Sequence, residues 1–240
     1  MLRRLALAVC SALLVTAASE PSRTPVLVEL FTSEGCSSCP PADRLLQRLD
    51  SEAIVLSEHV DYWDHQGWKD RFSSHAFTVR QESYARRFGL DSSYTPEMVI
   101  DGAAEFNGSD SARATQEIAK AARRPRAQVN LTRLPAGGLR IEVDSAPASG
   151  DVMLALADPA AQSQVAAGEN KGRSLTHVAI ARSLRKVGSV KHGIAFRNEI
   201  TLPPDAAAQR IVVFVQEDGQ ARVSGAAVLA PAAASYKPAP

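Results

Sequence analysis

Two cysteines, Cys36 and Cys39, lie in a tight turn between an apolar segment and an amphipathic one. Residues 26–31 form a short, mostly apolar run typical of a buried strand, and the leucines of 43–49 share one helical face. The pattern therefore predicts a strand, a turn that holds both cysteines, and a helix. A close pair of sulfurs in such a turn can form a redox-active disulfide, bind a metal ion or act as a structural staple.

The expected start of the helix separates the roles of the two sulfurs. Cys36 falls where the helix is expected to begin, near amide groups without helical partners and at the positive end of the helix dipole. Both effects favour the thiolate over the thiol, so Cys36 is interpreted as the attacking sulfur. Cys39, one turn further on, can close a small disulfide ring and release a bound partner, so it is interpreted as the resolving sulfur.

Residues 1–18 have the layout of a secretory signal peptide. Two arginines precede an apolar run at 5–15, and small residues lead to an expected cleavage after Ala18. The apolar run is shorter than the roughly 20 residues that span a bilayer, which argues against a membrane anchor. The third cysteine, Cys10, lies in this segment, so the mature chain keeps one pair. We expect an exported protein, periplasmic or secreted, in an environment where disulfides persist.

Composition agrees with a soluble globular protein and limits its partners. The chain has 240 residues, of which 45% are hydrophobic and 22% charged, with a formal net charge of +1. This balance provides no electrostatic attraction for nucleic acid or anionic lipid. No membrane span is expected after removal of the signal peptide, and no cofactor is expected. The expected partner is a protein or a small molecule that carries a thiol or a disulfide.

The hydrophobic pattern changes near Pro125, and this change predicts two domains. Residues 24–124 alternate between expected strands and helices, including a helix at 75–88. Residues 126–232 follow a period of two with about seven strand candidates, the spacing of an immunoglobulin-like β-sandwich. The arginines at the boundary are interpreted as a solvated helix end. Residues 233–240, rich in alanine and proline, are interpreted as a disordered tail.

The segment around the cysteines resembles the signature of a known family. Residues 28–43 are similar to the signature of an uncharacterised secreted bacterial family, domain of unknown function 1223, and the N-terminal part resembles a thioredoxin-like domain. Further segments that resemble the family are 59–64, 67–70, 94–102 and 168–177. The resemblance implies an α/β thioredoxin-like fold for residues 24–124 and an exported protein. It implies no particular substrate.

A proline near the third expected strand completes the candidate catalytic site. Thioredoxin-like folds place a cis-proline at a strand entry opposite the redox turn, and Thr95-Pro96 matches that position. A cis bond there would leave the Thr95 backbone free to pair with an extended substrate beside the sulfurs. An ordinary trans proline at a strand start is the alternative. We therefore group Thr95 and Pro96 with Cys36 and Cys39 as candidate catalytic residues.

Two glutamates and four aromatic residues are further candidates. Glu29 and Glu34 are candidates for proton transfer, because a carboxylate buried near cysteines needs a partner or a raised pKa. The candidate residues of a substrate groove are Tyr62, Trp63, Trp68 and Tyr94. Ordinary packing is the alternative for the two tryptophans. Gly35 departs from thioredoxins, which usually carry an aromatic residue before the first cysteine, so the choice of substrate stays open.

Three functions are compatible with the sequence, and we favour the first. It is a thiol-disulfide oxidoreductase, whose direction (oxidase, reductase or isomerase) depends on its reduction potential and its partner. The second is a copper-binding protein in which His59 or His65 joins the two cysteines. The ligands of a structural zinc site are missing from the pattern, and no metal residue is assigned. The third is a secreted binding protein with an inert disulfide, which would use the polar segment 168–176.

Overall fold

The computed structural model describes residues 24–232. The signal peptide expected at 1–18 and the tail expected at 233–240 lie outside the described residues. Residues 24–232 form eleven strands and three α-helices, joined by loops and two short 3-10 helices. None of these helices is long and apolar enough to cross a membrane. In chain order the strands and α-helices are β1 (Thr24–Thr32), α1 (Pro40–Leu49), β2 (Ala53–His59), α2 (His75–Phe88), β3 (Glu97–Ile100), β4 (Ala104–Asn107), α3 (Ser111–Ala122), β5 (Val129–Leu134), β6 (Gly138–Val143), β7 (Gly150–Gln164), β8 (Ser174–Val190), β9 (Phe196–Thr201), β10 (Arg210–Glu217) and β11 (Val223–Leu229).

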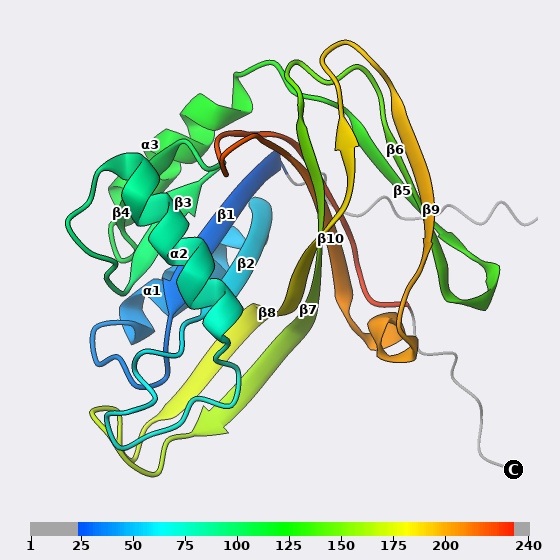
Figure 1. Ribbon diagram of the computed structural model, residues 1–240. Coiled ribbons are helices and arrows are strands. Elements are labelled where there is room, and N and C mark those ends of the chain that lie inside the picture. Colours follow the sequence, from blue (N-terminus) through cyan, green and yellow to red (C-terminus); the bar gives the residue numbers. More distant parts are fainter. Residues whose placement is uncertain (1–23, 233–240) are drawn as a thin grey trace, which may run out of the picture.

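Eight strands form one large mixed sheet, and the other three form a smaller sheet (Figure 1). The large sheet has the order β11-β10-β7-β8-β2-β1-β3-β4. In it β2 is parallel to both β1 and β8, and all other neighbouring strands are antiparallel. The small sheet has the order β5-β6-β9 with antiparallel neighbours.

The strand order shows that the predicted fold class is wrong. The sequence predicted an α/β thioredoxin-like domain followed by a separate immunoglobulin-like β-sandwich, but the described chain is mostly β and its two halves share one sheet. They join between β2 and β8, where Ser57 pairs with Ile180. The strands β7 and β8 form a long hairpin of 15 and 17 residues, and β10 pairs with β7 only over residues 150–157. Beyond that point β8 pairs with β2. The division near 124–126 into two domains stays a prediction.

The two faces of β1 and β2 pack against different partners, because successive side chains of a strand point to opposite sides. One face, which includes Val28, packs against α1 and α3. The other face holds Leu27 and Ile54, which pack against β7, β10 and β11. Nearer the cysteine turn, α2 covers this second face, and Tyr84 contacts the Phe31 ring edge to face. The two faces of β1 and β2 therefore have different packing partners: α1 and α3 on one face, and α2 with β7, β10 and β11 on the other.

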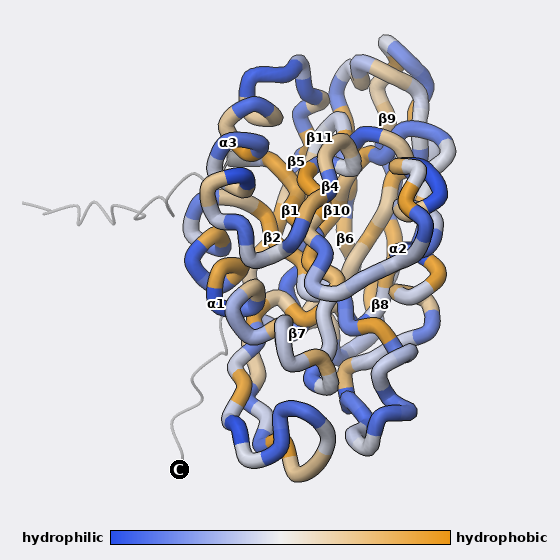
Figure 2. The backbone as a smooth tube through the Cα atoms, turned by 90° about the vertical axis from the view of Figure 1, so that its left-hand side faces the viewer, coloured by the Kyte–Doolittle hydropathy of each residue, from blue (hydrophilic) through white to orange (hydrophobic). Residues whose placement is uncertain are grey.

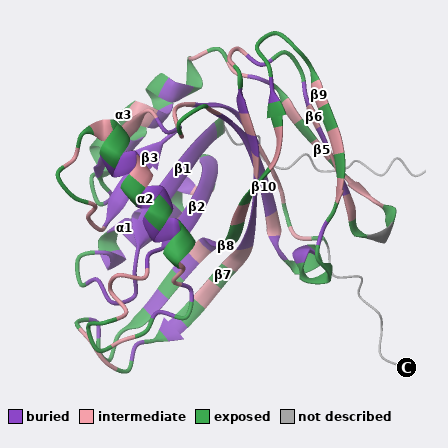
Figure 3. Ribbon diagram, in the orientation of Figure 1, coloured by how far each residue is buried: buried purple, intermediate pink, exposed green. Residues whose placement is uncertain are grey.

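Another core lies between the two sheets. Ile141 on β6 packs with Leu154 on β7 and Val213 on β10, and all three side chains are buried. Hydrophobic residues gather on the strands in the middle of the molecule, whereas the outer loops are mainly hydrophilic (Figure 2). β1 and β2 are buried along most of their length, in contrast to the strands of the small sheet (Figure 3). The large sheet thus holds the best-protected positions of the fold.

Both ends of α2 carry strong local signals, and the predicted helix at 75–88 is confirmed. The Ser74 side chain caps the N-terminus by accepting a hydrogen bond from the Ala76 amide. At the other end Gly89 has a φ of 71°, a left-handed conformation that glycine adopts readily. These two residues determine where the helix begins and ends without help from the rest of the chain.

The connection that follows α3 is packed against β1. The Arg126 side chain is 11% exposed and forms an ion pair with the fully buried Asp101. It also donates to the carbonyl of Pro25, and Asp101 accepts a 2.8 Å hydrogen bond from the Leu27 amide. The interpretation of Arg126 as part of a solvated helix end is therefore wrong, because its charge is needed to neutralise a buried carboxylate.

Candidate functional site

The two cysteines form a disulfide in the turn between β1 and α1, which we call the redox turn. Their Cα atoms are 5.4 Å apart, and the Cys39 amide donates a 3.2 Å hydrogen bond to the Cys36 carbonyl. Helix α1 begins at Pro40, so Cys39 is its N-cap and Cys36 precedes the helix. Pro40 and Pro41 lack amide hydrogens, which costs least in the first helical turn. The expectation that the helix begins at Cys36 and contains Cys39 is therefore wrong.

Ser38 connects the disulfide to the loop before β3. Cys36 and Cys39 are fully buried, whereas Ser37 and Ser38 are exposed. The Ser38 hydroxyl lies 3.3 Å from Cys36 Sγ and donates a long 3.4 Å hydrogen bond to the carbonyl of Thr95. Ser38 is thus an exposed side chain in contact with the buried Cys36 sulfur.

The Thr95–Pro96 peptide bond is cis, which confirms the expectation from the sequence. We call residues 94–96 the cis-proline loop. Trp63 Nε1 donates a 2.8 Å hydrogen bond to Thr95 Oγ1, which fixes this loop from the side of the β2–α2 connection. The same tryptophan explains Gly35, because a Cβ atom at Gly35 would lie only 3.1 Å from Trp63 Cβ. A side chain before the first cysteine would therefore require Trp63 to shift.

Gln81 and Glu97 support the cis-proline loop, and the sequence analysis missed both. Gln81 is fully buried on α2, and its Nε2 donates bonds of 2.6 Å to the Tyr94 carbonyl and 2.7 Å to Glu97 Oε2. Burial raises the pKa of Glu97 to about 7, although the bond from Gln81 acts in the opposite direction. A carboxyl group that titrates near neutral pH beside a candidate site is a candidate for proton transfer. No local pattern marks Gln81, since its partners come from another segment.

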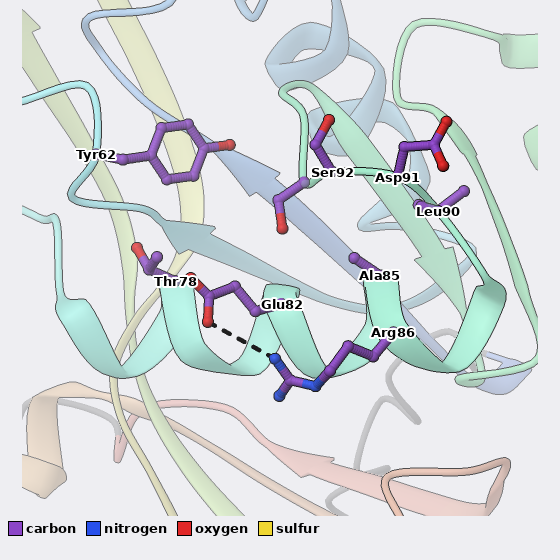
Figure 4. Close-up of a pocket in the computed structure, with 9 residues that line it drawn as sticks. Tyr62, Thr78, Glu82, Ala85, Arg86, Leu90, Asp91 and Ser92 are labelled. Atoms are coloured by element: carbon purple, nitrogen blue, oxygen red, sulfur yellow. Dashed lines mark ion pairs between the residues drawn. The ribbon is translucent and has the colours of Figure 1, made fainter.

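The four predicted groove residues have different surroundings. Tyr62 lines a cavity of about 450 Å³ between α2 and the loop that follows it (Figure 4). Trp63 lies next to the cis-proline loop, as described above, and the Tyr94 hydroxyl donates a 2.8 Å bond to a glutamate on β4. Trp68 points inward and donates a 2.7 Å bond to Glu34 Oε2. Tyr94 is thus part of the cis-proline loop, and Trp63 contacts that loop. Tyr62 lines the cavity beside α2, and Trp68 bonds to Glu34 in the redox turn.

Three carboxylates and two histidines lie buried beneath the redox turn, and we call them the inner cluster. None of them is more than 5% exposed. They come from the redox turn, α1, the end of β2, the β2–α2 connection and β8. The members in that order are Glu34, Asp43, His59, Asp70 and His177. Because these segments are far apart in the chain, only the tertiary structure brings the five side chains together.

His59 and Asp70 form the close pair of the inner cluster. His59 Nδ1 and Asp70 Oδ2 are 2.6 Å apart, and Asp70 also accepts hydrogen bonds from the amides of Glu34 and Phe72. Burial by itself would raise the pKa of Asp70, but the His59 charge and these donors lower it to about 2. Burial would likewise lower the pKa of His59, and the attraction of Asp70 raises it instead. The pair is therefore an ion pair from about pH 2 up to the raised pKa of His59.

His177 lacks a close partner. Its Nε2 is 3.8 Å from Glu34 Oε1 and its Nδ1 is 3.8 Å from Asp43 Oδ2, distances too long for hydrogen bonds. These four atoms and His59 Nε2 have no hydrogen-bond partner among residues 24–232. Glu34 was predicted for proton transfer, whereas Asp43 and His177 were missed, although His177 ends one of the family-like segments.

Glu29, the other predicted proton-transfer residue, lies on the opposite face of β1. Arg80 Nε donates a 2.6 Å bond to Glu29 Oε1, and the Tyr84 hydroxyl donates a 2.7 Å bond to Glu29 Oε2. Gln216 on β10 donates to the same hydroxyl. Burial, and then repulsion by Glu29, raise the pKa of the neighbouring Glu58 well above its usual range. We call these five residues the Arg80 cluster; they link α2 to both halves of the large sheet.

The turn between β7 and β8 also contacts the redox turn, and we call residues 165–173 the hairpin tip. Asn170 is fully buried, and its Nδ2 donates bonds of 2.9 Å to the Glu34 carbonyl and 2.8 Å to the Cys36 carbonyl. The adjacent Glu169 accepts a 3.2 Å bond from an amide of the same turn. From the sequence, residues 168–176 were predicted as a polar candidate surface, and 168–177 were identified as a family-like segment. Its resemblance to the family was the signal that could have pointed to a role at the cysteines.

The residues proposed for copper do not converge. His59 is bonded to Asp70, His65 is exposed, and the two sulfurs are bonded to each other. In the described part of the chain no group of three or more His, Cys, Asp or Glu side chains is arranged to hold a metal ion.

Comparisons with known proteins identify the chain's relatives. A family model described as "Protein of unknown function (DUF1223)" matches residues 27–216. A crystal structure of a protein from Agrobacterium tumefaciens is similar over 88% of this chain and 96% of its own, with 25% sequence identity and a TM-score of 0.75. HBP35 of Porphyromonas gingivalis is similar over 91% of this chain and 80% of its own, with 12% identity and a TM-score of 0.49. No curated protein matches the chain.

Proposed function

The chain belongs to this family of unknown function, and on that premise we propose that it is an exported thiol-disulfide oxidoreductase that uses Cys36 and Cys39. The observation that carries the proposal is the disulfide itself, which closes across two residues immediately before α1. Ser38 connects it to the cis-proline loop, and the inner cluster lies beneath it. A purely structural cross-link within one turn requires neither neighbour.

The reaction exchanges one disulfide for another. In the reduced protein the Cys36 thiolate attacks a sulfur of the partner's disulfide, so that a Cys36–partner bond forms and the partner's other sulfur leaves as a thiolate. Cys39, as a thiolate, then attacks Cys36 Sγ, which closes the Cys36–Cys39 bond and releases the partner's remaining sulfur as a thiolate. Two electrons pass from the protein to the partner. The same steps in reverse oxidise a partner dithiol.

Ser38 supports the choice of Cys36 as the attacking sulfur. Its hydroxyl, 3.3 Å from Cys36 Sγ, can donate to a thiolate and so favour the charged form. Because Ser38 is exposed, rotation of its side chain would uncover this sulfur without a change in the sheet. Cys39 is buried at the N-cap of α1 and is followed by two prolines, a position suited to the second, intramolecular attack.

The inner cluster supplies a group that can accept the Cys39 proton. Asp43 lies one helical turn beyond Cys39, and its amide donates a 3.1 Å bond to the Cys39 carbonyl. Side chains four residues apart on a helix share a face. Asp43 Oδ2, which has no hydrogen-bond partner among residues 24–232, is therefore available on the side of the helix that Cys39 faces.

Two single-cysteine variants test the function and the two roles. Reduced Cys39→Ser protein, mixed with oxidised glutathione, is expected to accumulate a mixed disulfide at Cys36, because no second sulfur resolves it. Cys36→Ser is the matched control and should be labelled far less. The mass of the intact protein measures both. Equal labelling would contradict the roles, and no labelling of Cys39→Ser would contradict the proposed function.

The burial of both cysteines favours a second candidate function, a secreted binding protein with a structural disulfide. Neither cysteine has solvent exposure, and Asn170 donates a hydrogen bond to the Cys36 carbonyl in the redox turn. Titration of free thiols after a mild dithiol reductant decides between the two. An oxidoreductase should release two thiols while the chain stays folded, as followed by circular dichroism. A disulfide that opens only on unfolding would support the binding protein instead.

Export has its own test, because it does not depend on the activity. Expression of the full chain in a bacterium should deliver a protein outside the cytosol that begins at Ser19. N-terminal mass analysis of the purified protein measures this start. A product that retains residues 1–18 in the cytosolic fraction would contradict export.

A further inference from the structure

We propose that the hairpin tip controls the reactivity of the redox turn: Asn170 anchors the tip on the turn, and the Glu169 carboxylate restrains ionisation of Cys36. This inference rests on the proposed thiol-disulfide activity and assigns a specific control to the same site. It makes Asn170 a positioning residue and Glu169 an electrostatic regulator. Neither residue contacts a sulfur atom through a hydrogen bond of its own.

Asn170 is held in one orientation by all of its polar atoms. Its Nδ2 donates to two main-chain carbonyls of the redox turn, and its Oδ1 accepts a 3.0 Å bond from Arg173. A fully buried amide with donors and acceptor in use is costly to move. Because the bonds go to carbonyl groups and not to sulfur, reduction of the disulfide removes none of them. The anchor therefore persists in the reduced protein, where Cys36 reacts.

The backbone of the tip is shaped for this close approach. Gly168 has a φ of 72°, a left-handed conformation that other residues rarely adopt. A Cβ atom at Gly168 would lie 3.1 Å from Trp68 Cβ, and Trp68 itself donates to Glu34. The tip thus lies directly on the loop that supports the inner cluster. This contact places Glu169 beside Ser37, the first of the two residues between the cysteines.

Glu169 accepts a hydrogen bond from the residue next to Cys36 and so places a like charge beside any thiolate at that position. Its Oε2 accepts a 3.2 Å bond from the amide of Ser37, the residue that follows Cys36. The hydrogen bonds from Ser37 lower the pKa of Glu169, so the carboxylate is charged at neutral pH. A thiolate at Cys36 would carry the same sign of charge as this carboxylate, and like charges disfavour the charged form. The nearby charge of Glu169 therefore raises the free energy of the thiolate form.

Other charges also surround the redox turn, and the test must separate Glu169 from them. The inner cluster lies below the turn, Arg44 is on α1, Lys69 is in the β2–α2 connection, and Lys171 and Arg173 are on the hairpin tip. Among the carboxylates of residues 24–232, Glu169 is the one that accepts a hydrogen bond from the main chain between the cysteines. It is also exposed, so its replacement leaves the core unchanged.

The decisive variant is Glu169→Gln, which keeps an acceptor for Ser37 and removes the charge. In the reduced Cys39→Ser background, the alkylation rate of Cys36 by iodoacetamide below the thiol pKa is expected to rise about two- to fivefold, because removal of a nearby like charge lowers the thiol pKa by a fraction of a unit. The midpoint of the pH–rate profile should move to lower pH. In about 1 M salt, where screening acts within about 3 Å, the two rates should approach each other.

Glu52→Gln is the matched control, because it removes the same charge from an exposed residue beyond the other end of α1. It should leave the profile unchanged. A Glu169→Gln profile equal to that of the parent, with normal exchange at Cys36, would overturn this inference and leave the proposed function intact. A Cys36 that forms no mixed disulfide in any variant would instead contradict the proposed function.

The anchoring role of Asn170 is tested by combining variants. In an Asn170→Ala background the tip is no longer held, so Glu169→Gln is expected to change the alkylation rate less than 1.5-fold, on the order of the error of such cycles. Asn170→Ser serves if the alanine variant melts at room temperature. A Glu169→Gln effect of the same size in a folded Asn170 variant would overturn the anchoring role.

Discussion

The inner cluster and the Arg80 cluster lie on opposite faces of β1 and β2, and they differ in how completely their charges are paired. In the Arg80 cluster, Glu29 receives bonds of 2.6 and 2.7 Å from Arg80 and Tyr84. In the inner cluster, His177 lies 3.8 Å from each of its two nearest carboxylates. Buried charges are costly unless they are paired and hydrogen-bonded. The close pairing indicates a structural link, whereas the loose pairing leaves buried polar atoms without hydrogen-bond partners among residues 24–232.

The difference between the clusters follows the position of the disulfide. Glu34, a member of the inner cluster, precedes Cys36 in the redox turn, whereas the Arg80 cluster joins α2 to β10 on the other side of the sheet. A structural link is strongest when every buried polar atom has a partner. A proton-transfer site needs atoms whose capacity is not filled. The following predictions, ordered by expected effect on the free energy of unfolding, test this contrast.

Removal of Arg80 should produce the largest loss of stability. Arg80→Ala leaves Glu29 buried without its cation, which typically costs about 3 to 5 kcal/mol. Arg86→Ala on the same helix is the matched control; its side chain is 68% exposed, and the loss should stay below about 1 kcal/mol. Urea unfolding at neutral pH measures both variants. Losses of similar size would contradict a structural role for the Arg80 cluster.

The close pair within the inner cluster should give a loss that depends on pH. Asp70→Asn removes a carboxylate whose pKa is lowered to about 2; relative to an ordinary Asp this is worth about 2.5 kcal/mol at pH 5 and about half of that at pH 3. The contribution of Asp70 is present above its unfolded pKa and is lost as the pH falls through about 2. The contribution from the raised pKa of His59 is present below its unfolded pKa of about 6.5 and is lost as the pH rises through the folded value.

Urea unfolding of Asp70→Asn between pH 3 and pH 8 measures this dependence. Asp91→Asn, at an exposed position, is the control and should show no such trend. A deficit of the same size at pH 3 and pH 5 would show that Asp70 does not contribute as an ionised partner.

Glu58 should behave in the opposite sense, because its pKa is raised well above the usual range by burial and by Glu29. Wild-type stability then falls as the pH rises above the unfolded pKa of Glu58, by about 1.4 kcal/mol per pH unit. Glu58→Gln removes this loss. From pH 4.5 to pH 6, the variant should therefore gain about 2 kcal/mol relative to wild type.

The comparison of pH trends isolates the ionisation of Glu58 from any packing change caused by the amide. Glu82→Gln on α2, at a side chain that is 50% exposed, provides the control trend. Parallel curves for wild type and Glu58→Gln would mean that Glu58 is ionised in the folded protein and that Arg80 neutralises both glutamates.

His177 should give the smallest loss, although it is buried. His177→Gln breaks no hydrogen bond among the described residues, so the expected cost is about 1 kcal/mol or less, from altered packing against Phe72 and His59. His59→Gln is the contrasting variant in the same cluster, because it breaks the 2.6 Å contact with Asp70. Thermal unfolding at pH 6 ranks the two. A larger cost for His177→Gln would mean that the inner cluster is as fully paired as the Arg80 cluster.

Local patterns predicted the positions of the elements well but not their arrangement. The helix at 75–88 is confirmed because Ser74 and Gly89 define its ends with local hydrogen bonds and backbone conformation. Residues 126–232 hold seven strands, β5 to β11, which agrees with the predicted number of about seven. A period of two tells which side of a strand is buried, but it does not identify the neighbouring strand. The pairing of Ser57 with Ile180, which overturned the predicted fold class, left no such mark in the sequence.

The candidate site shows the same division. Cys36 and Cys39 were predictable because they depend on residue types in a short segment, and the cis bond at Pro96 was predicted from its resemblance to the cis-proline position of thioredoxin-like folds. Gln81 and Asn170 were not predicted as site residues, although each holds one side of the site through main-chain carbonyls. A buried amide can bond to any carbonyl that the fold brings near it, so its sequence position does not reveal its partner.

The sequence by itself determined the strand, the turn with two cysteines and the helix, because hydrophobic period, proline and capping residues act over a few neighbouring positions. The tertiary structure alone decided that Glu34 lies with His177 beneath the disulfide and that Glu29 lies with Arg80 on the other face. Those assignments depend on which strands pair and which faces meet. They arise from packing between distant segments, where many alternatives satisfy the same local pattern.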